Sequence, residues 1–94
     1  MNTVKTAKGF ITVLNDKGLH TRPCTELARC ACRFRSKIRL RFQRLQVNAK
    51  SLLGILMLAA AKGSQIEVEA EGEDAEEALK ALDQLAKDKF YMNY

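Results

Sequence analysis

The only histidine of this 94-residue sequence, His20, lies beside residues that suit phosphate chemistry. Arg22 follows two positions later, and Pro23, the only proline, comes directly after it. Proline is favoured in the first turn of a helix, so we expect a helix to begin here. The unpaired N–H groups at a helix start attract anions, and a guanidinium offers a fork of donors that fits phosphate. Because neutral imidazole is a nucleophile, these residues predict phosphoryl transfer to His20, with Arg22 stabilising the added group.

A helix after His20 is supported by the spacing of the apolar residues that follow. They recur at positions i, i+3, i+4 and i+7, namely at Cys24, Leu27, Ala28 and Ala31. A single histidine near a turn has a simpler interpretation, however, as a surface or helix-capping residue. The choice between the two therefore depends on the rest of the chain.

The elements that must position His20 follow from two hydrophobic periods. Strict alternation predicts strands over 37–42, 45–47 and 65–71, and a short β-rich run predicts another over 10–14. Helical spacing predicts a last helix over 75–86, with Asp74 as its cap and Glu77 completing a capping box. Ser51 is expected to cap a further helix that is shorter than the apolar run 52–61.

This order of elements predicts an α+β fold of two layers. Each strand is apolar on one side only, so the helices should cover one face of the sheet. The other face carries two charge ladders, one of three basic residues on the strand 37–42 and one of three acidic residues on the strand 65–71. Opposite charges stabilise neighbouring strands, so we expect these two strands to lie side by side. The ladders are Lys37, Arg39 and Arg41, and Glu67, Glu69 and Glu71.

Composition excludes several classes of protein. The sequence has no apolar run long enough to cross a bilayer and no apolar segment near its start that resembles a secretion signal, so we expect a cytoplasmic protein without membrane insertion. The three cysteines, Cys24, Cys30 and Cys32, have no zinc-binding spacing and are expected to be small packing residues. We expect no metal or cofactor. The chain should form one domain over 1–94, with 1–8 and 88–94 loosely ordered or peripheral.

Three stretches together carry a resemblance to a known family. They are GLHTRP at 18–23, VNAKSLLG at 47–54 and AEGEDAEEAL at 70–79. In this order they resemble HPr, the histidine-containing phosphocarrier family of the bacterial phosphoenolpyruvate–sugar phosphotransferase system. The resemblance implies an open-faced β-α-β-β-α-β-α sandwich with a four-stranded antiparallel sheet of order 1-4-2-3. That order agrees with the neighbouring strands inferred from the charge ladders.

The resemblance also implies a carrier and not an enzyme. His20 would accept a phosphoryl group from enzyme I and pass it to a sugar-specific enzyme IIA, and Arg22 would hold that group. Ser51 matches the regulatory serine of the family, which in some bacteria is a substrate of a dedicated kinase and phosphatase. Arg29 would add positive charge for docking, or simply belong to a solvated helix face. The partner-binding residues would be Thr21, Pro23, Arg29, Leu52 and Leu53, on a protein expected to be a monomer.

The sequence departs from the family pattern at several positions. Gln43 and Arg44 occupy a turn that usually contains glycine, and Cys24 stands where alanine is usual. Leu53 replaces a residue that is often aromatic or methionine, which affects the choice of partner more than the chemistry. Two alternatives stay open: a regulatory binding protein without a sugar-transport role, and a basic nucleic-acid-binding module. The second is weaker, because the basic strand carries one aromatic residue, Phe42, expected to point inward.

Overall fold

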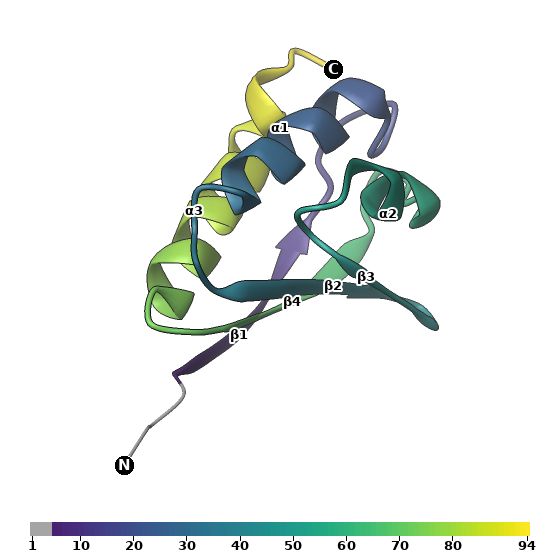
Figure 1. Cartoon of the computed structure of the whole chain (residues 1–94). Coiled ribbons are helices and arrows are strands. Elements are labelled where there is room, and N and C mark those ends of the chain that lie inside the picture. Colours follow the sequence, from purple (N-terminus) through teal and green to yellow (C-terminus); the bar gives the residue numbers. More distant parts are fainter. Residues whose placement is uncertain (1–4) are drawn as a thin grey trace.

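In the computed structural model, which describes residues 5–94, three helices cover one face of a four-stranded antiparallel sheet (Figure 1). The strand order is β1-β4-β2-β3, which confirms the predicted α+β open-faced sandwich. The elements in chain order are β1 (Thr6–Thr12), α1 (Thr21–Ala31), β2 (Lys37–Phe42), β3 (Leu45–Asn48), α2 (Leu52–Met57), β4 (Gln65–Glu71), α3 (Ala75–Lys87) and a 3-10 turn, η1 (Lys89–Tyr91).

The first strand lies earlier in the sequence than its apolar residues suggested. It was predicted over 10–14, but β1 begins at Thr6 and ends at Thr12. Its partner β4 is seven residues long and pairs with every position of β1, from Thr6 opposite Glu71 to Thr12 opposite Gln65. Backbone pairing therefore sets the strand bounds. Residues 6–8, which were expected to be loose, belong to the sheet, whereas 1–4 lie outside the described residues.

The charge ladders confirm the predicted pairing of β2 with β4. Lys37, Arg39 and Arg41 lie directly opposite Glu71, Glu69 and Glu67. The guanidinium of Arg39 lies 3.3 Å from Glu69 and 3.7 Å from Glu71, and Lys8 on β1 reaches Glu69 at 3.3 Å. Each such exposed pair contributes only about 0.2–1 kcal/mol. The charge pairs favour the observed register of β2 against β4. Burial favours the same register, since a shift by one residue would move every buried side chain to the solvent face.

The core lies between the sheet and the helices and extends further along the chain than expected. Alternate residues of β2 and β4, such as Ile38, Leu40, Ile66 and Val68, are fully buried beneath α1 and α3. Phe90 is also fully buried. The expectation that 88–94 is peripheral is therefore wrong for Phe90, because a large aromatic side chain gains more from filling the space beside α1 and α3 than from exposure to water.

The two predicted helix caps behave differently. Ser51 caps α2 as expected, since its hydroxyl accepts a hydrogen bond from the Gly54 N–H at 3.1 Å. Asp74 occupies the N-cap position of α3 but makes no side-chain cap bond, so the predicted capping box is wrong. Its carboxylate instead accepts hydrogen bonds from the Arg35 and Ser36 N–H groups, both at 2.9 Å, and from the Ser36 hydroxyl. Asp74 therefore ties the start of α3 to the loop before β2.

The cysteines divide into two kinds. Cys24 and Cys30 are buried in the core as predicted, and burial raises the pKa of the Cys24 thiol to about 11. Cys32 is exposed, which corrects its assignment as a packing residue. It is the C-cap residue of α1, at the start of the loop that leads to β2.

The turn between β2 and β3 predicts a gain in stability on substitution. Gln43 has φ = 57°, a left-handed conformation that costs a residue with a Cβ atom about 1–2 kcal/mol. Gln43→Gly should therefore raise the free energy of unfolding by about 0.5–1 kcal/mol, measured by urea denaturation. Gln46→Gly, in the regular strand β3, should lower it by a similar amount. Equal effects of the two substitutions would contradict this prediction.

Asp74 predicts a loss of stability in acid. The hydrogen bond from the Ser36 hydroxyl, together with that from the Arg35 N–H, lowers the pKa of this carboxyl from 3.8 to about 2. Because the folded-state pKa is lowered, its stabilising effect is complete above the unfolded pKa and is lost as pH falls from about 5 to about 2. Asp74→Asn should be less stable than wild type at neutral pH and should lose less stability over that interval. Asp83→Asn, at an exposed ion pair, is the control for thermal melts across pH.

Candidate functional site

His20 is the N-cap residue of α1, and its side chain takes no part in capping the helix. Its backbone is extended, with φ = −85° and ψ = −170°, and its carbonyl accepts from the Cys24 N–H at 3.0 Å. The imidazole makes no cap bond. The first-turn N–H groups of a helix have no partner within it, so those of Thr21 and Arg22 are available beside the ring, while Pro23 has none to leave unpaired. The predicted helix start is confirmed.

A close backbone contact fixes the loop that carries His20. Gly18 has φ = 71°, and a Cβ atom at this position would lie 2.6 Å from the Ala60 carbonyl oxygen. The same carbonyl accepts from the Leu19 N–H at 2.8 Å. Only glycine allows this approach, because it tolerates positive φ and lacks the clashing atom. The segment after α2 therefore holds His20 at the start of α1.

The ring of His20 is covered on one side by a residue that the sequence did not indicate. Tyr94 stacks on the imidazole, with ring centroids 5.3 Å apart and planes inclined by 23°. The Arg22 guanidinium donates to the Tyr94 hydroxyl at 3.4 Å. His20 Nε2 is buried and has no hydrogen-bond partner. No sequence signal marked Tyr94, since its contacts cross more than 70 residues of chain.

Four of the five predicted docking residues are exposed on α1 and α2, two helices that pack against each other. Thr21 and Arg22 are exposed, whereas Pro23 is buried in the first turn of α1, which corrects its assignment as a docking residue. Leu52 and Leu53 are 39% and 69% exposed. Met57, 60% exposed, was missed by the sequence reasoning, although its i+4 spacing from Leu53 places both on one face of α2.

Arg29 lies on the same face of α1 as Arg22. The two side chains line one surface pocket together with Thr25, Glu26 and Met92. Arg29 is largely exposed and lies 3.7 Å from the Glu26 carboxylate. Its positive charge is thus partly compensated, but it extends the basic surface that begins at Arg22.

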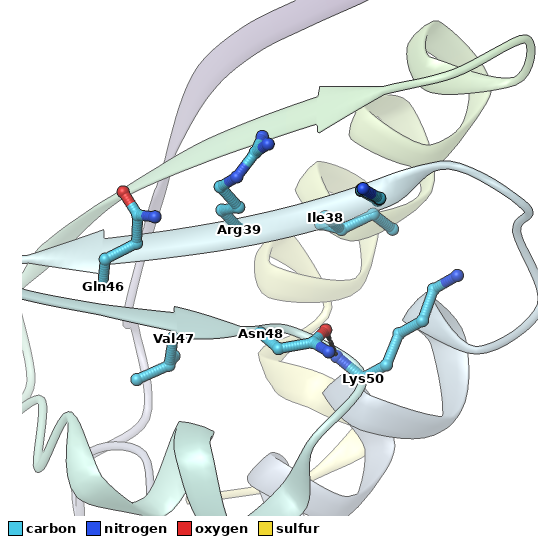
Figure 2. Close-up of a pocket in the computed structure, with 7 residues that line it drawn as sticks. Ile38, Arg39, Gln46, Val47, Asn48 and Lys50 are labelled. Carbon is cyan, nitrogen blue, oxygen red and sulfur yellow. Dashed lines mark hydrogen bonds between the residues drawn. The ribbon is translucent and has the colours of Figure 1, made fainter.

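A larger pocket, of about 360 Å³, lies elsewhere, between β2, β3 and the segment before α2. Figure 2 shows Arg39, Gln46, Asn48 and Lys50 around it. None of its lining residues belongs to the His20 loop or to α1, and the Lys50 ammonium is already bonded to the Phe34 carbonyl at 2.6 Å. This larger pocket is therefore separate from His20.

Two structural features are absent from residues 5–94. Within that range no group of three or more His, Cys, Asp or Glu side chains could hold a metal ion. No helix in the same part of the chain has the length and apolar character needed to span a membrane.

The only histidine of the sequence thus lies half-buried at a helix start on an open-faced sandwich, with the Arg22 side chain nearby. Comparison with known proteins gives the family. The family model "PTS HPr component phosphorylation site" matches residues 7–88. The phosphocarrier protein HPr of Treponema pallidum is 42% identical over 80 residues, covering 85% of this chain and 91% of that protein. The chain belongs to the HPr family of phosphocarriers.

Solved structures agree with this assignment. HPr from Thermoanaerobacter tengcongensis superposes with a TM-score of 0.88 at 38% identity, covering 94% of this chain and 99% of that one. HPr from Bacillus anthracis gives 0.80 at 39% identity, covering 84% and 94%. The protein is therefore a phosphocarrier of the phosphotransferase system and not a catalytic enzyme. A related Thermoanaerobacter structure (TM-score 0.73, 41% identity, covering 85% of this chain and 92% of that one) is an HPr dimer, so the monomeric state stays a prediction.

Proposed function

We propose that His20 accepts a phosphoryl group from enzyme I and passes it to a sugar-specific enzyme IIA. The observation that carries this proposal is the position of the sole imidazole at the N-cap of α1, beside Arg22 and without a cap bond of its own. A phosphoryl group on the ring would meet the Thr21 and Arg22 N–H groups and the positive end of the helix dipole. The three free thiols suit the reducing cytoplasm as the place of this transfer.

The burial of Nε2 selects the nucleophilic atom. Because Nε2 is enclosed, Nδ1 is the ring nitrogen that a donor can reach. Its lone pair forms the new N–P bond as the bond between the phosphorus atom and enzyme I breaks, and transfer to enzyme IIA breaks the N–P bond in turn. No proton or further reactant is consumed, so the carrier needs no general base.

The proposed docking surface combines a basic and an apolar part. Thr21, Arg22 and Arg29 on α1 contribute the first, while Leu52 and Leu53 on α2 contribute the second, now with Met57 added. Positive charge raises the rate of encounter with an acidic partner, and the exposed apolar side chains lose their contact with water when it docks. Exclusion of water also protects the N–P bond during transfer.

Labelling tests the acceptor directly. Incubated with phosphoenolpyruvate and a bacterial enzyme I, the wild-type chain should take up one acid-labile phosphate, and His20→Ala should take up none. Arg22→Ala should still be labelled, but more slowly, because it keeps the nucleophile and loses the guanidinium. Both variants should melt close to wild type, since neither side chain belongs to the core. Label that persists in His20→Ala would exclude His20 as the acceptor.

We also propose that phosphorylation of Ser51 inhibits transfer through His20. The Ser51 hydroxyl is at the start of α2, directly before Leu52 and Leu53. A phosphate there would gain from the helix N-terminus, so the fold should tolerate it. It would also place about two negative charges beside apolar docking residues. An acidic partner would then meet both repulsion and a cost of desolvation.

The aspartate variant separates docking from folding. Ser51→Asp should slow transfer from enzyme I by about tenfold, equivalent to about 1.4 kcal/mol, mainly through a weaker apparent affinity. Its melting temperature should stay near that of wild type. Lys80→Gln changes the net charge by the same amount at an exposed position on α3 and should leave the rate unchanged. An unaltered rate in Ser51→Asp would remove Ser51 from the docking surface.

A further inference from the structure

The 88–94 segment runs back toward His20, the proposed phosphoryl acceptor. Burial of Phe90 and hydrogen bonds from Asn15 hold it there. Phe90 is fully buried against the helices, and the chain end marked C in Figure 1 lies beside the first turn of α1. The buried amide of Asn15 donates to the Lys89 carbonyl at 2.9 Å and to the Tyr94 backbone oxygen at 2.7 Å. Asn15 lies in the same loop as Gly18 and therefore connects the loop before His20 to the returning segment.

The return requires a strained backbone. Lys89, Phe90 and Tyr91 have φ values of 53°, 54° and 65°, three consecutive residues in the left-handed region that lack the freedom of glycine. Such conformations persist only where surrounding contacts determine them, and they cluster at functional sites. In this chain the burial of Phe90 and the bonds from Asn15 supply those contacts. These contacts therefore fix the course of the 88–94 segment and the position of Tyr94.

At that place Tyr94 contacts three residues of the proposed site. Its ring stacks on the His20 imidazole at 5.3 Å between centroids, and its hydroxyl accepts from Arg22 Nη1 at 3.4 Å. The ammonium of Lys17 lies 5.2 Å from the centre of the same ring. With one imidazole face covered and Nε2 buried, rotation of the His20 side chain is restricted.

We propose that Tyr94 is a positioning residue for phosphoryl transfer. Its ring holds the imidazole with Nδ1 toward the partner, and its hydroxyl holds the Arg22 guanidinium beside the position that the phosphoryl group will occupy. This inference rests on the proposed role of His20 as acceptor. Preorganisation of this kind acts on the rate of transfer within the docked complex and leaves docking itself nearly unchanged.

Three variants test the proposal. Tyr94→Ala removes the stack and the hydroxyl, and Tyr94→Phe removes the hydroxyl alone. Tyr91→Ala, in the preceding turn η1, removes a tyrosine that is 70% exposed. In the unphosphorylated protein, the ring-proton NMR shifts of His20 report the stack by ring current. They should change in Tyr94→Ala and be retained in the other two variants. Retained shifts in Tyr94→Ala would overturn the proposal.

Transfer from phosphorylated enzyme I is then measured at low and at saturating concentrations of the carrier. Tyr94→Ala should lower the maximal rate about tenfold at little changed KM, Tyr94→Phe should keep most of that rate, and Tyr91→Ala should match wild type. A faster Tyr94→Ala would show that Tyr94 is a cover that partners must displace, and unchanged kinetics would show that it is a bystander. Either result overturns the proposal. A wild-type chain that takes no label overturns the function of His20 as well.

Discussion

The pairing of β4 with β1 is the constraint on which the site depends, because this pairing continues beyond the sheet. After Thr12 and Gln65, the last paired residues, Val13 donates to the Ser64 carbonyl at 2.9 Å and accepts from Gly63 at 2.7 Å. The Leu19 N–H then reaches the Ala60 carbonyl. The two chain segments thus stay in contact from the β1–β4 pair to Leu19, the residue before His20. Sheet register and imidazole position are therefore parts of one hydrogen-bonded arrangement.

This arrangement explains how a small protein can carry a reactive group on a half-buried side chain at the start of a helix. Backbone N–H groups at the start of α1 supply most of the proposed anion environment, and Arg22 adds one exposed cation. A phosphocarrier must release its group as readily as it accepts it, so a shallow site with few charges suits the task better than a deep one. The neighbouring α2 leaves Leu53 and Met57 in water, which is costly for the isolated protein but useful to one that docks repeatedly.

Local signals in the sequence were reliable where the interacting atoms are close along the chain. Ser51 caps α2 because its partner, Gly54, is three residues away. Asp74 carries the same kind of signal, yet its carboxylate bonds to Arg35 and Ser36. In the folded chain the N–H groups of Arg35 and Ser36 lie close to Asp74. They compete with the N–H groups of α3 for its carboxylate. A capping pattern shows only that a side chain can cap, whereas packing decides which donors it meets.

By itself the sequence determined the alternation of the strands, the neighbouring charge ladders, the start of α1 at His20 and Arg22, and the HPr resemblance, because periodicity, helix-end preferences and motifs are local properties. Only the tertiary structure decided that β1 extends back to Thr6 and that Phe90 belongs to the core. It alone also placed Tyr94 on the imidazole. These features rest on contacts between segments far apart in the chain. Their energies depend on which surfaces meet after folding, a property that no short stretch of residues contains.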